Sequence, residues 1–182
     1  MSLRIISGQW RGRKLVAPEG DTTRPTADRT RETLFSMLTS RLGTFEGLAV
    51  ADLFAGSGAL GLEALSRGAA SCIFAEHDPA ALRALRRNIA ALRAQPECDV
   101  RATSATALTP AKQPLDLILM DPPYGSGAGA VALDRLNRLG WVASSSWISI
   151  ETSRNEGVQV KGFTVETVRD TGKARLHLLR PE

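Results

Sequence analysis

The chain of 182 residues has little of several features that mark specialised classes of protein. Its two cysteines, Cys72 and Cys98, lack the close spacing of a zinc or redox motif, so we expect small buried hydrophobic side chains and no disulfide framework. No apolar run approaches the roughly 18 residues that a membrane span needs. The first residues also lack the apolar segment of a signal peptide. These absences predict a cytoplasmic protein that does not enter a membrane.

Positive charge is concentrated at one end of the sequence. The formal net charge is +4, and residues 1–31 alone carry seven basic side chains against three acidic ones. The rest of the chain is balanced. A basic segment on a neutral body can bind a polyanion such as nucleic acid, and it can equally be a solvated face. Charge alone leaves both interpretations open.

The first 43 residues predict a small extension that precedes the main fold. Residues 4–18 contain short β-like runs broken at Gly8 and Gly12, a pattern typical of a hairpin. Between residues 24 and 43, apolar side chains recur at helical spacing, and Gly43 can close the helix. We therefore interpret residues 1–43 as a basic hairpin-and-helix extension of a single domain whose core is residues 44–182.

From residue 48 onward, strand-like and helical segments alternate. Strands are expected at residues 50–54, 71–76, 99–104, 115–120 and 146–151. Helices are expected at 59–68, at 131–140 and after Asp78, which can cap a helix that begins with Pro79. Residues 163–180 contain two alternating runs joined at a Thr-Gly pair, which is typical of a hairpin. This order predicts an α/β fold, a doubly wound sheet with an antiparallel edge.

A glycine-rich loop follows the first of these strands. The sequence DLFAGSGALG (52–61) contains Gly56, Ser57 and Gly58, and it partly matches the G-x-G-x-x-G pattern of dinucleotide sites. Glycines let the backbone turn sharply and let a ligand approach closely. Asp52 stands just before the loop, where a carboxylate would help to hold a cationic amino-acid group and would repel a pyrophosphate.

Two other strand ends carry candidate ligand contacts. Glu76 ends the second strand, eighteen residues after Gly58, near the distance at which such folds place an acid on ribose hydroxyls. The alternative for Glu76 is an ordinary surface carboxylate at a strand end. Ser104 and Ala105 end the third strand and would lie beside an adenine if the ligand is a nucleoside.

The fourth strand ends in the motif DPPY. It comprises Asp121, Pro122, Pro123 and Tyr124, which is the only tyrosine in the chain. The prolines fix or restrict the backbone and make a stiff corner. We expect residues 125–130 (GSGAGA) to form a flexible loop that could act as a lid.

Together, the 52–61 loop, Glu76 and DPPY resemble the S-adenosylmethionine-dependent methyltransferases that modify exocyclic amino groups. With RIISGQWRGRKL, RPTADRTRETLFSML and DLFAGSGALGLEALSRGA included, nearly the whole chain resembles the RsmD family, bacterial enzymes that methylate N2 of one guanine in 16S ribosomal RNA. The resemblance implies the seven-stranded, Rossmann-like sheet of class I methyltransferases. It also implies S-adenosylmethionine as methyl donor, S-adenosylhomocysteine as product, no metal, and a substrate presented by the small ribosomal subunit.

The same resemblance implies roles for individual residues. The methionine portion of the cofactor would contact the first-strand loop, the ribose would contact Glu76, and the adenine would lie against Ser104 and Ala105. RNA would be bound by basic and polar side chains of the extension. The loop residues are Asp52, Phe54, Gly56, Ser57 and Gly58, and the RNA-binding residues are Arg11, Arg13, Lys14, Arg24, Thr26 and Arg29.

DPPY suits chemistry on an aromatic amine, whose nitrogen is a poor nucleophile while its lone pair is delocalised into the ring. The Asp121 carboxylate and the Pro122 carbonyl can each accept one N–H bond and so direct the lone pair toward the methyl donor. Tyr124 can stack on the extruded base, an interaction worth about 1–3 kcal/mol. Asp121 or water could take the released proton.

Other functions remain open at the level of sequence. DPPY does not by itself choose the base, so adenine-N6 methylation of DNA or RNA is the main alternative, although such enzymes more often carry asparagine at the position of Asp121. An NAD-dependent oxidoreductase would explain the partial glycine pattern but neither Asp52 nor DPPY. A catalytically silent RNA-binding protein would not need an intact site. We expect a monomer.

Overall fold

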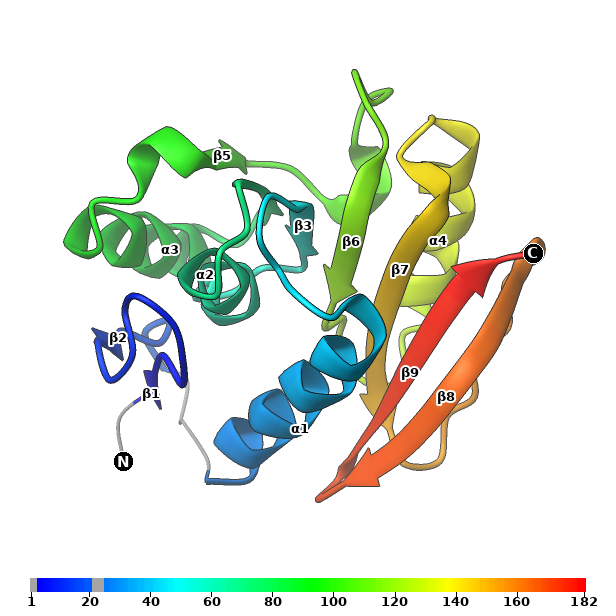
Figure 1. Cartoon of the computed structure of the whole chain (residues 1–182), viewed down its shortest axis with the longest axis horizontal. Coiled ribbons are helices and arrows are strands. Elements are labelled where there is room, and N and C mark those ends of the chain that lie inside the picture. The colour runs from blue at the N-terminus through cyan, green and yellow to red at the C-terminus, as the bar shows by residue number, and fades with distance from the viewer. Residues whose placement is uncertain (1–2, 21–24) are drawn as a thin grey trace.

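The structure, a computed structural model, describes residues 3–20 and 25–182, with the side chains of residues 25 and 26 outside that description. A seven-stranded sheet forms its centre (Figure 1). From one edge to the other, its strands are β5 (Cys98–Arg101), β4 (Ser71–Ala75), β3 (Ala49–Leu53), β6 (Leu115–Met120), β7 (Val142–Ser153), β9 (Ala174–Pro181) and β8 (Phe163–Thr171). The predicted doubly wound sheet is therefore confirmed.

Strand directions divide the sheet into a parallel part and an antiparallel edge. The strands β5, β4, β3, β6 and β7 pair in parallel, whereas β9 runs antiparallel to both β7 and β8. Because β3 is followed by β4 on one side and has β6 on the other, the strand order reverses between β3 and β6. Sheets of this kind bind ligands at the carboxyl ends of the strands at that reversal.

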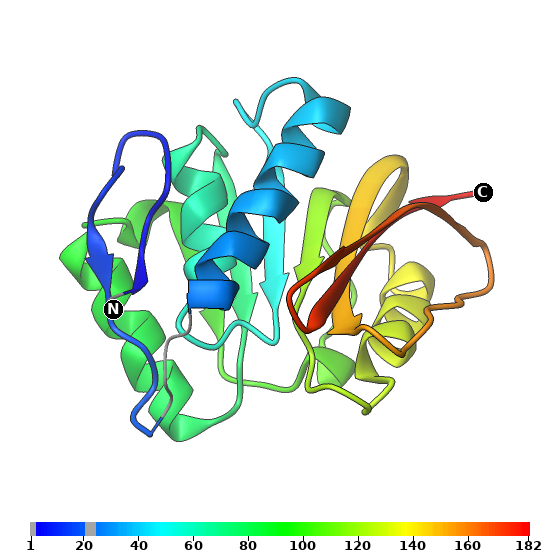
Figure 2. The same ribbon diagram turned by 90° about the horizontal axis from the view of Figure 1, so that it is seen from below.

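Helices cover both faces of the sheet (Figure 2). The helices α1 (Pro25–Leu42), α2 (Ala59–Ser66) and α3 (Pro79–Ala91) pack on one face, and α4 (Ala128–Arg138) packs on the other. Within β6, Leu117 and Leu119 join the first core, while Ile118 and Met120 join the second. This alternation explains the continuous apolar run, because a parallel strand is buried on both faces.

The N-terminal hairpin is pinned to α2 by one buried carboxylate. Its strands are β1 (Leu3–Arg4) and β2 (Lys14–Leu15), paired antiparallel. Glu63 is fully buried and accepts the backbone N–H groups of Ile6 and Ser7 at 2.8 and 3.1 Å. It also pairs with Arg67 at 2.9 Å and with the buried Arg31 of α1 at 3.9 Å. One side chain thus joins the extension, α1 and α2.

Several predicted boundaries are confirmed and others are wrong. Strand 115–120 is confirmed, and Asp78 caps α3 by accepting the N–H of Ala81 at 2.9 Å. The predicted strand 99–104 ends at Arg101, because Ser104 caps a short 3-10 helix, η2 (Ala105–Ala107). A second such helix, η1 (Gln95–Glu97), precedes β5. The strand predicted at 146–151 extends over Val142–Ser153.

The loop predicted at residues 125–130 is wrong in its second half, since α4 already begins at Ala128. Gly129 is required inside this first turn. A Cβ atom there would lie 2.8 Å from the Ile150 side chain and 3.3 Å from Pro122, so only glycine lets the helix pack so closely. Only residues 125–127 remain outside regular structure, which leaves a short turn in place of the expected lid.

Within the described part of the chain, no helix has both the length and the apolar character that crossing a bilayer would require.

Replacing Glu63 with alanine should lower the free energy of unfolding by about 3–5 kcal/mol, because it leaves the buried Arg31 with only Asp28 as a carboxylate partner and unpins the hairpin. Urea denaturation measures this change. Glu32→Ala, which removes an exposed glutamate from the same helix as Arg31, should stay within about 0.5 kcal/mol of wild type. Equal losses in the two variants would contradict the role given to Glu63.

Candidate functional site

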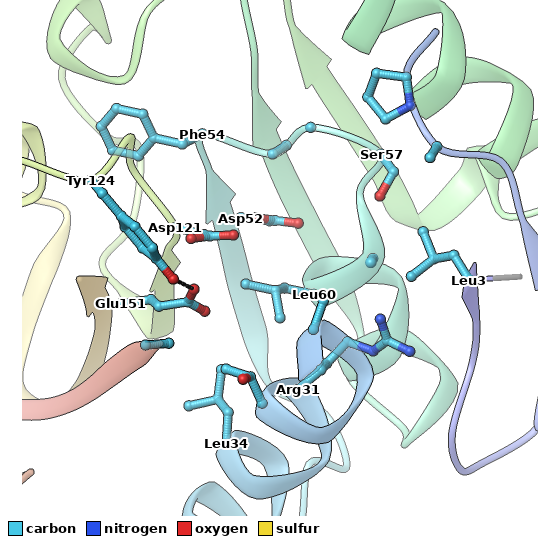
Figure 3. A pocket seen from close by; sticks show the side chains of 18 of the residues that line it. Leu3, Arg31, Leu34, Asp52, Phe54, Ser57, Leu60, Asp121, Tyr124 and Glu151 are labelled. Carbon is cyan, nitrogen blue, oxygen red and sulfur yellow. Dashed lines mark hydrogen bonds between the residues drawn. The ribbon is translucent and has the colours of Figure 1, made fainter. Parts of the chain in front are cut away.

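A pocket of about 460 Å³ lies at the carboxyl ends of β3 and β6, at the reversal of strand order (Figure 3). Parallel pairing sets Asp52 opposite Leu119 and Leu53 opposite Met120, so the residues that follow these strands meet at one edge. Its polar and aromatic lining comes from α1, the β3–α2 loop, DPPY, β7 and the β8–β9 turn, and includes Thr30, Arg31, Asp52, Phe54, Ser57, Asp121, Tyr124, Glu151 and Lys173.

Asp52 is the most deeply buried acid of this pocket, with 1% of its surface exposed. Its Oδ2 accepts the backbone N–H of Gly61 at 2.9 Å, which ties β3 to the first turn of α2. Burial raises the pKa of Asp52 to about 8; the Gly61 bond opposes this rise, and the charge of Glu76 adds to it. At neutral pH the site therefore holds an acid that a nearby cation would help to ionise.

The glycine loop leaves regular strand geometry directly after β3. Phe54 adopts a left-handed backbone with φ of 62°, which ends the strand one residue earlier than predicted. Gly56 is also left-handed, with φ of 55°, and has open space where a Cβ would stand. Phe54, Gly56 and Ser57 line the pocket, as does Asp52 before them. Gly58 packs instead against Leu85 and does not line it.

Glu76 holds this loop in place. Its Oε1 accepts the N–H of Gly56 at 2.8 Å, and its Oε2 accepts the N–H groups of His77 and Asp78 at 2.9 Å. Glu76 is thus half-buried and engaged, unlike an ordinary surface carboxylate at a strand end. Glu76, Ser104 and Ala105 lie on the side of β4 and β5 and do not line the pocket, and the Ser104 hydroxyl caps η2.

The DPPY corner brings its acid and its tyrosine into the pocket. Asp121 and Tyr124 line it, whereas Pro122 is buried beneath, against Gly129. The Tyr124 side chain is 49% exposed, and its hydroxyl donates to Glu151 Oε2 at 2.9 Å (Figure 3). Burial raises the pKa of Glu151, and hydrogen bonds with Tyr124 and Asp121 act in the opposite direction.

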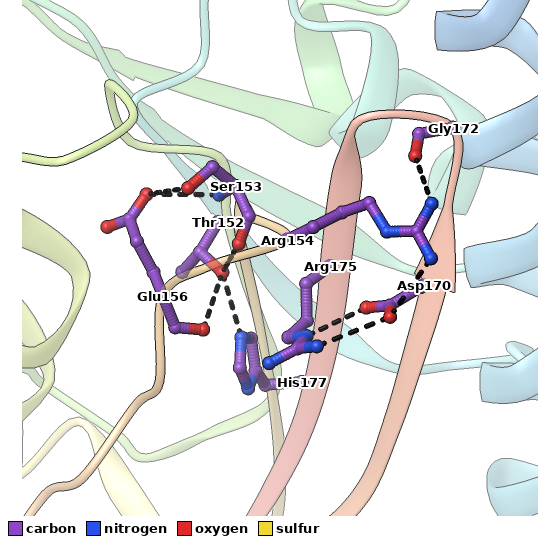
Figure 4. A network of polar contacts seen from close by, with 8 residues as sticks. All are labelled: Thr152, Ser153, Arg154, Glu156, Asp170, Gly172, Arg175 and His177. Atoms are coloured by element: carbon purple, nitrogen blue, oxygen red, sulfur yellow. Dashed lines mark hydrogen bonds and ion pairs between the residues drawn. The ribbon is translucent and has the colours of Figure 1, made fainter.

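Two glutamates near the end of β7 hold this corner, and neither was predicted as a site residue. Glu151 bonds to the Tyr124 side chain, and Glu156 Oε1 accepts the backbone N–H of Gly125 at 2.8 Å. Glu156 also accepts the N–H and hydroxyl of Ser153 at 3.0 and 2.8 Å (Figure 4). The sequence did contain one signal for Glu151, because this acid is the last residue of the predicted strand 146–151. That strand lies next to the strand that ends in DPPY.

The extension contributes to the pocket through α1 and places other basic residues on the surface. Thr30, Arg31 and Leu34 line the pocket, while Arg29 is exposed and does not. Arg24 and the side chain of Thr26 lie outside the described residues. Sequence reasoning assigned Arg31 no site role, although helical spacing from Ala27 places it on the pocket face.

The remaining predicted RNA contacts lie on the hairpin. Arg11 and Lys14 are exposed, and so is Arg13, whose Nη2 also donates to the carbonyl of Ala91 at the end of α3 at 2.9 Å. The neighbouring helix α3 adds exposed basic side chains and contains no acid; these are Arg83, Arg86 and Arg87. The basic surface is therefore larger than the predicted one, because tertiary packing sets α3 beside the hairpin.

Comparisons with known proteins match nearly the whole chain. A family model described as conserved hypothetical protein 95 matches residues 3–180. Ribosomal RNA small subunit methyltransferase D of Escherichia coli strain K12 is 40% identical over 156 residues, which cover 86% of this chain and 77% of that relative. The solved structure of Escherichia coli yhhF has a TM-score of 0.84 at 36% identity and covers 100% of this chain and 99% of its own. Magnesium protoporphyrin IX methyltransferase of Synechocystis PCC 6803, solved with bound SAM, shares the fold alone, at 13% identity and a TM-score of 0.68, covering 90% of this chain and 87% of its own.

The buried Asp52 should make stability depend on pH in a defined window. Between the ordinary aspartate pKa of 3.8 and the raised value of about 8, the folded chain keeps a proton that the unfolded chain releases. The free energy of unfolding should therefore fall as pH rises through this window, and it should fall less in Asp52→Asn, which does not titrate. Urea denaturation of both proteins at several pH values measures the difference, and parallel profiles would refute the assignment.

Proposed function

The chain belongs to the RsmD family of ribosomal RNA methyltransferases, and from that premise we propose that it transfers a methyl group from S-adenosylmethionine to N2 of a guanine in 16S ribosomal RNA. The substrate would be the small ribosomal subunit, and S-adenosylhomocysteine would be the second product. The observation that carries the proposal is the meeting, in one pocket, of a buried acid near the end of β3 and the DPPY corner after β6.

The residues around the β3 loop fit S-adenosylmethionine. Asp52 presents a buried carboxyl group to the pocket, where the ammonium of an amino acid would lower its pKa and pair with it. The open space above Gly56 admits a ligand against the backbone. Glu76 accepts three backbone N–H bonds, and because a carboxylate offers about four acceptor sites, one remains for a ribose hydroxyl.

The adenine portion would lie farther along the sheet, on Ser104 and Ala105 at the start of η2, which follows β5, and β5 pairs with β4 beside Glu76. When bound, the cofactor supplies a sulfonium-activated methyl group.

The DPPY corner supplies what the target amine needs. Asp121 Oδ and the Pro122 carbonyl accept the two N–H bonds of the amino group, which aims the nitrogen lone pair at the methyl carbon. Tyr124 stacks on the extruded base. On accepting the methyl group, the amine would give up a proton, which Asp121 or water would take. Positioning of this kind can reach effective molarities of roughly 10⁵ M.

The basic surface fits an RNA backbone. The hairpin, which carries the exposed Arg11 and Lys14, is bonded to α3, which carries exposed arginines of its own, and both lie on the same face of the sheet as α1. Phosphate contacts of this kind orient the RNA over the pocket without reading its sequence.

Arg11→Ala combined with Lys14→Ala should weaken binding of 16S ribosomal RNA and reduce the slope of log affinity against log salt by about one for each side chain, since each lost contact releases fewer counterions. Arg13 is left intact because its guanidinium also fixes the hairpin to α3. Filter binding across a salt series measures the slope. The control is Arg135→Ala with Arg138→Ala on α4, across the sheet, and an equal change there would show that the effect is only one of net charge.

Asp121→Ala should abolish methyl transfer while S-adenosylmethionine still binds. In the proposed mechanism Asp121 contacts the target amine, whereas the cofactor is held by Asp52 and the loop that follows β3. Wild type and variant are incubated with tritiated cofactor and small subunits from a strain that lacks the enzyme, and calorimetry measures cofactor binding. Equal turnover would remove Asp121 from the mechanism. Mass spectrometry of the labelled RNA then identifies the base, and label on adenine N6 would replace the guanine assignment with the alternative one.

A further inference from the structure

Among the described residues that line the pocket, Glu151 is the one acid that the proposed reaction leaves without a task. It lies near the end of β7, the strand that pairs in parallel with β6, so it stands beside the residues that follow Met120. Its Oε2 accepts the Tyr124 hydroxyl at 2.9 Å, and Asp121 projects into the same part of the pocket (Figure 3).

We propose that Glu151 is a positioning residue which, in its protonated form, orients both Asp121 and Tyr124 for the target base. Its carbonyl oxygen accepts the Tyr124 hydroxyl, and its acid proton is donated to one oxygen of Asp121. The inference rests on the function proposed above, because it assigns Glu151 to the same reaction. It goes further in making the geometry of DPPY depend on a strand outside that motif.

The tyrosine needs such a partner because it stands at the rim of the pocket. Nearly half of its side chain is exposed, so packing alone does not restrict the ring. A hydrogen bond from the hydroxyl at the far end of the ring limits its rotation about both side-chain torsions. The ring is then already held in one orientation before the extruded base binds. This preorganisation lowers the conformational entropy that is lost when the base stacks on the ring.

Asp121 needs Glu151 as a partner for a different reason. Two carboxyl groups in hydrogen-bond contact share a proton, because two carboxylates at that separation would repel each other. Burial of Glu151 raises its pKa and favours the neutral form, against the hydrogen bonds with Tyr124 and Asp121, which lower it. A proton held by Glu151 leaves Asp121 ionised, with its second oxygen available to accept the amine N–H. In the part of the chain that the structure describes, three other ionisable groups face the same pocket, namely Asp52 from β3, Arg31 from α1 and Lys173 from the β8–β9 turn.

The corner already has an anchor for its backbone, so the contact with Glu151 does more than maintain the fold. Glu156 holds the N–H of Gly125, and Gly129 packs beneath Pro122. Glu151 bonds instead to side chains, and they are the two that the proposed reaction uses. An anchor for the loop alone would not need to select those atoms.

The contact can be tested without any turnover, because Tyr124 is the only tyrosine of the chain. Protein labelled with ¹³C at tyrosine Cζ gives one resonance, which reports the hydrogen bond of the hydroxyl. Glu151→Ala should shift this signal, whereas Glu151→Gln should leave it near its wild-type position, since the amide oxygen still accepts. In wild type the signal should also titrate above the ordinary glutamate value of about 4.3, and Glu151→Gln should remove that titration.

Kinetics then separate positioning from proton transfer. Glu151→Ala should lower kcat about tenfold, because it removes the hydrogen bonds that orient Tyr124 and Asp121, and Glu151→Gln should restore most of it, because glutamine reproduces the acceptor and the donor of neutral glutamate. If Glu151 were instead a general base, glutamine would lose about 10²-fold or more, and that result would overturn the proposal. An alanine variant with wild-type kcat and an unmoved signal would also overturn it.

The control is Glu166→Ala, which removes an exposed glutamate of β8 and should change neither kcat nor the tyrosine signal. A wild-type protein that labels no ribosomal RNA would refute the proposed function, whereas the tyrosine signal would still test the contact. Active wild type with an equally active alanine variant would refute only the role of Glu151.

Discussion

The parallel pairing of β3 with β6 is the constraint on which the site depends. It sets Leu53 beside Met120, so the chain leaves both strands at one edge and in one direction. Asp52 and Asp121 are far apart in sequence and lie in one pocket for this reason alone. The turn that follows each strand then decides what can bind: a glycine loop offers open backbone at Gly56, and a stiff diproline corner brings the Asp121 side chain to the pocket.

Buried carboxyl groups serve two purposes in this protein. Glu63 and the half-buried Glu76 hold backbone in place: the first accepts amides of the hairpin and pairs with arginines, and the second accepts one amide of the glycine loop and two that follow β4, with the ribose as its proposed further partner. Asp52 and Glu151 are less fully compensated, and burial raises the pKa of both. An acid that is costly to ionise in the free protein is well suited to bind a cation, which favours its ionised form, or to retain a proton at neutral pH.

Sequence reasoning succeeded where a local pattern has one structural solution. The apolar run 115–120 could only be a strand covered on both faces, and Asp78-Pro79 could only begin a helix. It failed where packing overrode composition. Glycine content predicted a loop through residue 130, but a helix without a Cβ at Gly129 packs tightly on Ile150 and Pro122, and α4 starts at Ala128. Of the six residues expected to form a lid, the last three are therefore the first turn of α4.

The sequence by itself determined the strand and helix order, the glycine loop, the DPPY motif and the basic extension, because each is written in neighbouring residues with fixed spacing. Only the tertiary structure decided that Arg31, Glu151 and Lys173 share the pocket with Asp52 and Asp121. It also decided that α3 extends the basic surface of the hairpin. These residues come from different elements, and no local spacing encodes which elements meet. Their meeting follows from strand order and helix packing, which depend on burial of the whole core.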